Sequence, residues 1–170
     1  MRHEYVATHD GSVLLIIDFQ QGMLKVMDSW ERIARKVTQL IHAADVLGVP
    51  VLVTEQYKKG LGETHPDLLQ EIKSPVVFQK EHFSACLETD FLSTVRSLHR
   101  HKIVVVGMET HVCVLQTCLD LIKAGFQVHL AADAVASRTS ENRDIAIELL
   151  RQAGAVVGQT RISPGAISRT

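Results

Sequence analysis

The stretch HKIVVVGMETHVCVLQTCLDLIKAG, residues 101–125, decides how this chain is organised. Its β-branched run, residues 103–106, is typical of a strand that is buried on both faces, as in a parallel sheet. Gly107 interrupts the run, and a helix that ends at Gly125 is predicted after a short connection. The apolar positions that predict this helix are Val112, Val114, Leu115, Cys118, Leu119, Leu121 and Ile122. We therefore expect a strand–helix unit of an α/β fold.

The same rhythm recurs along the chain. We predict strands at residues 13–17, 49–54, 76–78, 103–106, 127–131 and 155–158, and helices at 30–47, 65–72, 89–98, 112–125 and 141–153. Residues 55–64 are expected to form a long surface loop and residues 133–140 a turn-rich connection, while the tail to residue 170 is weakly patterned. Short connections from helices back to strands predict a single α/β domain over residues 1–170, with three α/β/α layers. Its doubly wound, six-stranded parallel sheet would have the strand order 3-2-1-4-5-6.

Composition limits the classes of function. The 170 residues carry a net charge of −1, which offers neither a basic footprint for nucleic acid nor a polybasic patch for a membrane. Three widely spaced cysteines argue against a disulfide framework and favour a reducing compartment. The first twelve residues lack the apolar segment of a secretory signal. We therefore expect a soluble, cytoplasmic protein.

Cys113 lies at the start of the predicted helix that follows the central strand. If Thr110 caps that helix, the sulfur lies among unpaired backbone N–H groups at the positive end of the helix dipole. Such a place favours the thiolate and supplies donors for a developing oxyanion. The alternative is that Cys113 is a small buried hydrophobic residue, which is the common fate of a free cysteine.

Asp18 follows the apolar strand at residues 13–17 directly. A carboxylate at the carboxyl end of a buried parallel strand lies where α/β folds bind ligands. In the order 3-2-1-4-5-6, strands one and four are neighbours, so Asp18 and Cys113 would face the same crevice. The alternative role for Asp18 is to cap a following helix, and Lys80, just after the third strand, would by itself be an ordinary solvated lysine.

Three motifs together resemble a known family. VVVGMETHVCVLQT (104–117) is similar to the nucleophile segment of the isochorismatase-like cysteine hydrolases, which include nicotinamidases and N-carbamoylsarcosine amidases. LLIIDFQ (14–20) resembles the first strand of that family, which ends in an aspartate, and VFQK (77–80) resembles its strand that ends in a lysine. TEQYKKGLG (54–62) is most similar to the isochorismatase domain-containing branch. The similarity covers nearly the whole chain.

The resemblance implies a site and a reaction. Asp18, Lys80 and Cys113 would form a catalytic triad, and the backbone N–H groups of Glu109 and Cys113 would form an oxyanion hole beside a cis peptide at Met108–Glu109. The reaction would be cleavage of a C–N bond in a small amide-like molecule through a thioester. The family also implies a homo-oligomer, a dimer or tetramer. Residues that would line the substrate pocket are Phe19, Gln20, Glu55, Gln56, Tyr57, Phe83, Thr110 and His111.

Two departures from nicotinamidases bear on the substrate. Their Asp-x-His-x-x-His metal motif is replaced by EQYKKG at residues 55–60, so we expect no metal and no other cofactor. His111 and Val112 stand where nicotinamidases often carry an aspartate and an aromatic residue. Two other classes of function remain open. One is a catalytically idle member of the fold that serves binding or assembly, and the other is a thiol redox protein, although no Cys-x-x-Cys is present.

Overall fold

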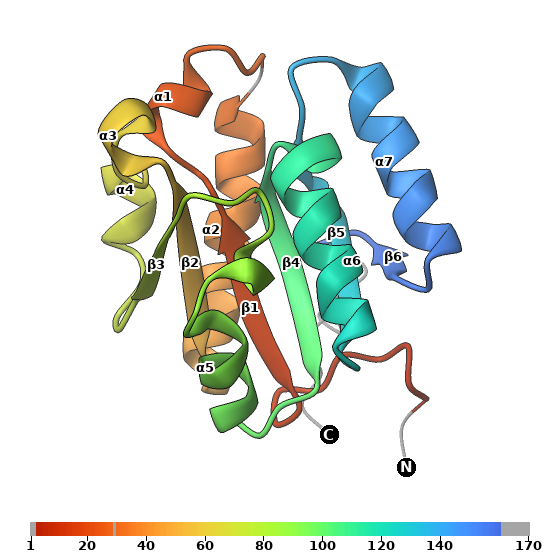
Figure 1. Ribbon diagram of the computed structural model, residues 1–170. Coiled ribbons are helices and arrows are strands. Elements are labelled where there is room, and N and C mark those ends of the chain that lie inside the picture. The colour runs from red at the N-terminus through yellow and green to blue at the C-terminus, as the bar shows by residue number, and fades with distance from the viewer. Residues whose placement is uncertain (1–2, 29, 161–170) are drawn as a thin grey trace.

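The computed structural model describes residues 3–28 and 30–160, and its centre is one all-parallel sheet of six strands (Figure 1). The strand order is β3-β2-β1-β4-β5-β6, which confirms the predicted doubly wound α/β fold. The strands are β1 (Ser12–Ile17), β2 (Val51–Gln56), β3 (Val76–Lys80), β4 (Lys102–Met108), β5 (Gln127–Ala136) and β6 (Val156–Gly158). The order reverses between β1 and β4, and the crevice for a ligand in such sheets opens at the carboxyl ends of these strands.

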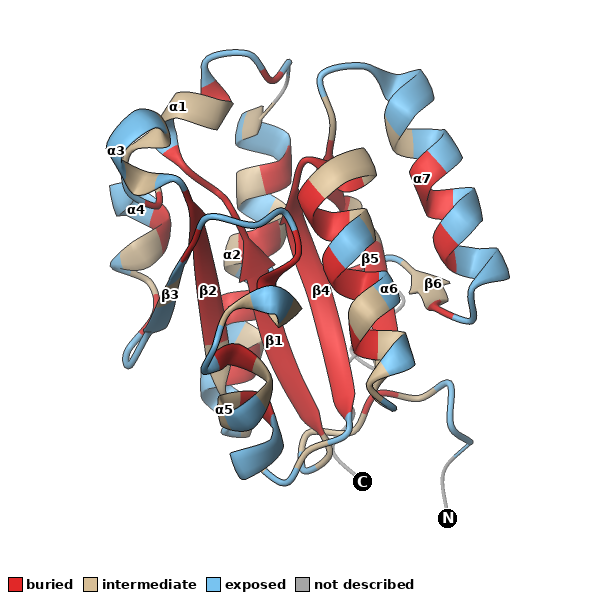
Figure 2. Cartoon of the chain, in the orientation of Figure 1, coloured by how far each residue is buried: buried red, intermediate tan, exposed pale blue. Residues whose placement is uncertain are grey.

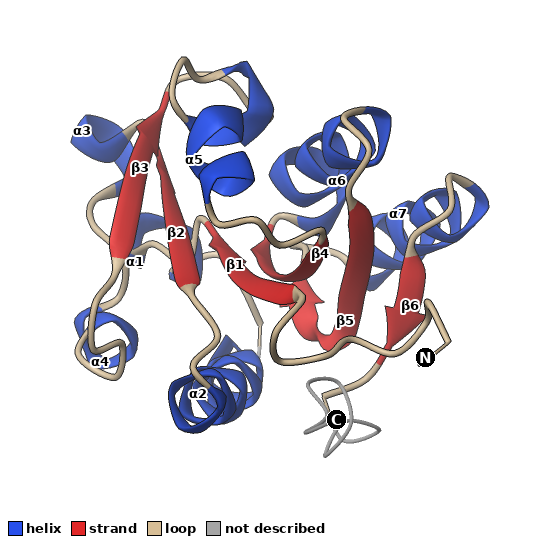
Figure 3. Cartoon of the chain, turned by 90° about the horizontal axis from the view of Figure 1, so that it is seen from below, coloured by secondary structure: helices blue, strands red, loops and turns tan. Residues whose placement is uncertain are grey.

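Helices cover both faces of the sheet. In Figure 3, α2 and α4 lie on one side and α5, α6 and α7 on the other. The helical segments are α1 (Gln21–Leu24), α2 (Trp30–Leu47), α3 (Lys58–Leu61), α4 (Pro66–Leu69), a 3-10 turn (Ala85–Leu87), α5 (Phe91–Ser97), a π-helical turn (Thr110–Val114), α6 (Leu115–Lys123) and α7 (Ser140–Gln152). None of the helices described is both long and apolar enough to span a membrane.

The two central strands read as unbroken apolar runs because both of their faces are covered. Every residue of β1 and of β4 is buried (Figure 2). Alternate side chains enter two separate clusters, so that Leu14 and Ile16 pack with α2 while Val13, Leu15 and Ile17 pack on the opposite face. Burial of both faces fixes the register of these strands, and with it the height at which each strand ends.

Several predicted boundaries differ from the structure. The predicted turn-rich connection at residues 133–140 is wrong in its first half, because β5 continues to Ala136 after a register shift between Val105 and Gly107. The shift renews the pairing with β4 through Gly107–Val135 and Met108–Ala136. The expected loop at residues 55–64 contains the end of β2 and the short α3. The tail beyond residue 160 lies outside the described residues.

Gly107 marks the closest approach of β4 to β1. Its φ is 121°, and a Cβ atom placed there would lie 2.0 Å from the backbone oxygen of Ile17. No side chain fits at that distance, so only glycine lets β4 pass the end of β1 immediately before Asp18. The glycine that interrupts the apolar run in the sequence is therefore required by a contact between the backbones of β4 and β1.

Replacing Gly107 with alanine should destabilise the whole fold. We expect Gly107→Ala to lower the free energy of unfolding by more than about 3 kcal/mol, measured by urea denaturation, because a methyl group and the Ile17 carbonyl cannot occupy one place. Gly48→Ala is the matched control, since Gly48 also has a positive φ, 64°, but nothing within 4 Å of the added atom. That control should cost only about 1–2 kcal/mol. Equal losses for the two variants would contradict the steric argument.

Candidate active site

Asp18 leaves the end of β1 in a left-handed backbone conformation, with φ at 50°. Aspartate is one of the few residues that adopt this conformation readily. The turn buries its carboxylate, whose Oδ1 accepts a hydrogen bond of 2.6 Å from the Thr54 hydroxyl on β2. Such a bond fixes the direction of the carboxylate and leaves the second oxygen, Oδ2, for another partner.

Lys80 ends β3 and sends a completely buried side chain across β2. Its Nζ lies 2.8 Å from Asp18 Oδ2, with side-chain exposures of 0% and 2% for the lysine and the aspartate. The same nitrogen donates to Gln56 Oε1 at 2.6 Å. It also donates to the backbone oxygens of Phe83 at 3.1 Å and His82 at 3.3 Å. The protein therefore supplies acceptors for all three N–H groups of this ammonium.

Cys113 lies in the π-helical turn that joins β4 to α6. The backbone oxygen of Glu109, which an α-helix would pair with the N–H of Cys113, instead accepts from Val112 at 3.1 Å and Val114 at 3.2 Å. The side chain is buried, and its sulfur lies 4.0 Å from Gln56 Oε1. Asp18, Lys80 and Cys113 thus reach one place from the ends of β1, β3 and β4.

Thr110 does not cap the helix. Glu109 occupies the N-cap position without a capping side chain, and Thr110 is the first residue of the π-helical turn. Its hydroxyl is buried and has no hydrogen-bond partner among the described residues. The reason is that the chain turns into a π-helix rather than an α-helix here, a choice that the apolar spacing of the sequence does not reveal.

Burial opposes the preference for the thiolate that we expected from the place of Cys113. Burial raises the pKa of Cys113 to about 12, and the negative charge of Asp18 adds to that rise while Lys80 opposes it. Burial raises the pKa of Cys86 to about 12 as well. Burial therefore favours the thiol over the thiolate, and a base beside the sulfur would assist its action as a nucleophile.

The connection between β5 and α7 holds the nucleophile segment from outside. Arg138 donates two hydrogen bonds to the Glu109 carboxylate, from Nη2 to Oε1 and from Nε to Oε2, each 3.1 Å long. Its backbone N–H also donates to Oε2 at 3.2 Å. Ser137 Oγ lies 2.9 Å from His111 Nδ1. The Met108–Glu109 peptide between β4 and this segment is cis. Sequence reasoning missed Arg138, whose only signal is its place after the carboxyl end of a strand.

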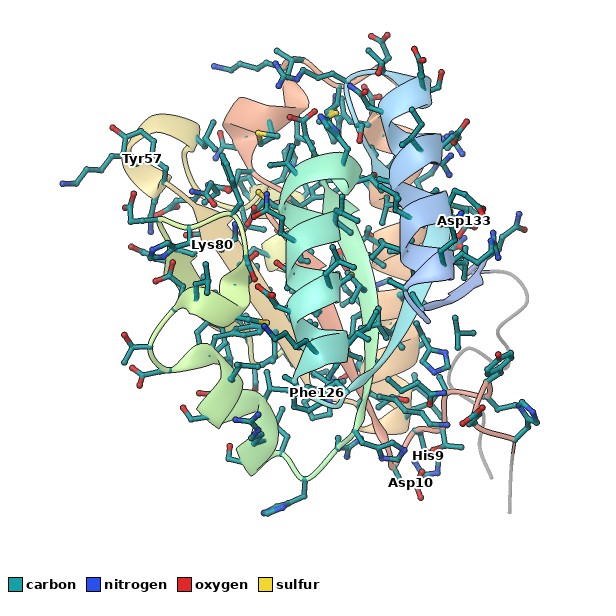
Figure 4. The ribbon with its side chains drawn as sticks, turned by 45° about the vertical axis from the view of Figure 1, so that its right-hand side comes forward. His9, Asp10, Tyr57, Lys80, Phe126 and Asp133 are labelled. Atoms are coloured by element: carbon teal, nitrogen blue, oxygen red, sulfur yellow. The ribbon has the colours of Figure 1, made fainter. Side chains whose placement is uncertain are left out.

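The residues expected to line a substrate pocket have different surroundings. Phe19 packs in the core on the α2 face, while Tyr57 and Phe83 are exposed, and Figure 4 shows Tyr57 at the outer edge of the fold. Gln20 donates from Nε2 to the backbone oxygens of Gln56 at 2.9 Å and Gly62 at 2.7 Å. Thr110, His111 and Gln56 lie on the segments that carry or contact Cys113.

The stretch that replaces the metal motif of nicotinamidases is used for internal contacts. Glu55 Oε1 accepts from the backbone and hydroxyl of Thr64 at 2.8 and 2.9 Å, and the Gln56 carboxamide is bonded to Lys80 and to the Glu81 carbonyl. Within residues 3–28 and 30–160, no group of three or more His, Cys, Asp and Glu side chains is arranged to hold a metal ion. These residues do not fit a nicotinamidase-type metal site.

The doubly wound α/β fold and the meeting of Asp18, Lys80 and Cys113 at the carboxyl ends of its strands agree with the comparison of this sequence with known proteins. The isochorismatase domain model matches residues 12–162, and the chain belongs to this family. A secreted isochorismatase effector, Isc1, of Phytophthora sojae is 39% identical over 86% of this chain and 71% of its own length. Isochorismatase domain-containing protein 2 of Danio rerio is 34% identical over 88% of this chain and 75% of its own length. The family resemblance is thus confirmed.

Solved structures share the same architecture. The MAR1 ribonuclease of Caenorhabditis elegans superposes with a TM-score of 0.87 at 34% identity, covering 93% of this chain and 81% of that one. A pyrazinamidase/nicotinamidase of Streptococcus mutans gives a TM-score of 0.75 at 22% identity, covering 86% of this chain and 99% of that one, a likeness that shows the fold alone.

Removing one partner of the buried ion pair should be far more damaging than removing an exposed one. We expect Lys80→Met to lower the free energy of unfolding by about 3–5 kcal/mol in urea denaturation, because Asp18 is left buried without its counter-charge. Adding Asp18→Asn should restore part of that loss, since the two residues are coupled. Lys73→Met, which removes the exposed 2.8 Å pair with Asp45, is the control and should cost less than about 1 kcal/mol. Similar losses for both lysines would contradict this account.

Proposed function

We propose that this protein is a cysteine hydrolase that cleaves the C–N bond of a small, amide-like substrate through a thioester, without a metal or other cofactor. The observation that carries the proposal is the buried Asp18–Lys80 pair beside Cys113. A thiol that is neutral at rest needs a base within reach, and Asp18 is the carboxylate whose charge acts on it. Membership of a family with hydrolase members supports the same reading.

The first half of the reaction forms the thioester. Asp18 takes the proton of the Cys113 thiol, and the sulfur attacks the carbonyl carbon of the substrate as a new C–S bond forms. The negative charge passes to the carbonyl oxygen, which the backbone N–H groups of Glu109 and Cys113 would hold. Asp18 then returns its proton to the leaving nitrogen, the C–N bond breaks, and an amine or ammonia departs.

The second half regenerates the enzyme. Asp18 takes a proton from water, and the resulting hydroxide attacks the thioester carbon. The C–S bond then breaks to release a carboxylic acid, and Asp18 returns its proton to the sulfur of Cys113. Lys80 donates to three protein oxygens and is paired with Asp18, so it would act on the charges of Asp18 and the sulfur rather than on the substrate. The net charge of −1 provides no basic footprint for RNA or DNA, so we propose a small molecule as substrate. Three free cysteines fit a reducing compartment such as the cytoplasm.

Cysteine-dependent release of ammonia or amine tests this function. We expect a library of small amides to contain substrates for the wild-type protein and Cys113→Ser to slow their hydrolysis by about 1,000-fold or more, measured by ammonia release. Cys86→Ser is the matched control and should leave the rate unchanged, as should a chelator of divalent ions. If no amide is hydrolysed and Cys113 is not trapped by an aldehyde, the fold is catalytically idle and serves binding or assembly.

We also propose that the chain forms a homo-oligomer, a dimer or tetramer. Neighbouring helices α6 and α7 expose large apolar side chains, which are Leu119, Ile145 and Leu149. Ile145 and Leu149 lie one turn apart on α7 and so share one face of that helix. A patch of this kind on the surface of a single chain is typical of a protein–protein contact, and a second copy would cover it.

Charges placed in this patch should separate the subunits. We expect the wild-type protein to sediment as a dimer or larger at micromolar concentration, and the double variant Ile145→Glu with Leu149→Glu to sediment as a monomer with unchanged circular dichroism. Two glutamates would lose their hydration if the interface stayed closed. A wild-type monomer would contradict the proposal, and an oligomer that survives both substitutions would place the interface elsewhere.

A further inference from the structure

Gln56, at the end of β2, is fixed on three sides before it reaches the active site. Its backbone N–H donates to Gln20 Oε1 at 2.7 Å, and its backbone oxygen accepts from Gln20 Nε2 at 2.9 Å. Its side-chain Nε2 donates to the backbone oxygen of Glu81 at 3.0 Å. Because the nitrogen of the carboxamide is committed to that carbonyl, its oxygen is directed to the opposite side.

That single oxygen meets two of the three residues to which we give catalytic roles. Gln56 Oε1 accepts from Lys80 Nζ at 2.6 Å and lies 4.0 Å from the sulfur of Cys113. The side chains of Asp18 and Lys80 are also hydrogen-bonding neighbours of this sulfur. Lys80 has other acceptors, but among them only Gln56 and Asp18 offer side chains, and Gln56 is the neutral one.

We propose that Gln56 is a positioning residue whose uncharged oxygen, which contacts both Lys80 and the sulfur of Cys113, sets the pH at which that sulfur becomes reactive. This inference rests on the proposed function and goes beyond it, because it assigns to a residue of β2 the control of the nucleophile. An amide oxygen aimed at the sulfur accepts from the thiol and repels the thiolate. A carboxylate in its place would repel the thiolate more strongly and would also compensate the charge of Lys80.

The other charged groups near this point have partners of their own. On the nucleophile segment, Glu109 is paired with Arg138 and His111 is bonded to Ser137. After β3, His82 is paired with Glu88, and on β2, Glu55 accepts from Thr64 and lies near Lys58. The charges that act directly on Cys113 are Asp18, which follows β1, and Lys80, which ends β3. A change of charge at residue 56 should therefore appear directly in the titration of the sulfur.

The experiment compares two substitutions of opposite character. Gln56→Glu keeps the shape of the side chain and adds a charge, while Gln56→Met keeps its length and removes the oxygen. The rate of alkylation of Cys113 by acrylamide, followed by mass spectrometry between pH 6 and pH 10, reports the thiolate fraction without any substrate. Gln116→Glu makes the same charge change on an exposed residue of α6, three positions after Cys113, and serves as the matched control.

The proposal requires shifts in opposite directions. Gln56→Glu should move the alkylation profile up by about one pH unit or more, a slowing of about tenfold at neutral pH, and Gln56→Met should move it down. Gln116→Glu should leave the profile unchanged, because a charge in water is screened. A purely structural role would shift both Gln56 variants alike, and that result, or no shift in either, would overturn the proposal. If Gln56→Glu does not fold, the alkylation profile of Gln56→Met alone tests the proposal: a downward shift supports it, and an upward shift or none overturns it.

Failure of this inference is distinguishable from failure of the proposed function. The alkylation profiles need only a reactive sulfur, so they are interpretable even when no amide is hydrolysed. Opposite shifts together with an unsuccessful amide screen would leave Gln56 as a positioning residue of a binding protein. Ammonia release from amides with unshifted profiles would leave the hydrolase without this control by Gln56.

Discussion

The site depends on two opposite charges, Asp18 and Lys80, that are held almost out of reach of water. Burying them is costly, and their attraction offsets that cost only where the geometry is good and the remaining oxygens and protons are satisfied. The strand between them meets both conditions, since β2 supplies Thr54 to the aspartate and Gln56 to the lysine. The order β3-β2-β1 therefore does more than build a sheet: it places a cation, its hydrogen-bond partners and an anion in one row along the ends of three strands.

The other half of the site comes from the opposite side of the switch point. At the end of β4, Gly107 lets the backbone pass within contact of Ile17, and the π-helical turn follows at once. That turn brings the sulfur of Cys113 to the Asp18–Lys80 pair, while Arg138 from the connection after β5 holds the carboxylate of Glu109. Two contacts thus fix the nucleophile segment, namely the backbone contact between Gly107 and Ile17 and the ion pair between Glu109 and Arg138. Its geometry depends on contacts that lie far apart in the sequence.

The sequence predicted the features that depend on local pattern or on the order of motifs. The strands that begin at Val13 and Ile103 could be predicted as apolar runs because both of their faces are buried. The glycines that end the helices predicted the alternation of helices and strands and, with it, the order of the sheet. Features that depend on tertiary contacts were not predictable in this way. The extension of β5 follows from a shift in its pairing with β4, the π-helical turn replaced the expected cap at Thr110, and the resting state of Cys113 follows from burial that residue spacing does not report. Arg138 is exposed for much of its length and has no motif, so only the structure connects it with Glu109.

These contacts also limit the charge that the site offers to a substrate. Among the residues that the structure describes, the permanent cations of the site are Lys80 and Arg138, which are paired with the carboxylates of Asp18 and Glu109. Transfer of the Cys113 proton to Asp18 moves charge from oxygen to sulfur without changing the total, so the ammonium of Lys80 has an anion beside it before and after the transfer. An anionic substrate would add a charge that neither cation is free to compensate, whereas a neutral amide needs only hydrogen-bond donors for its carbonyl oxygen as charge develops on it. For the hydrolase that we propose, the charges of the site therefore favour a neutral substrate over an anionic one.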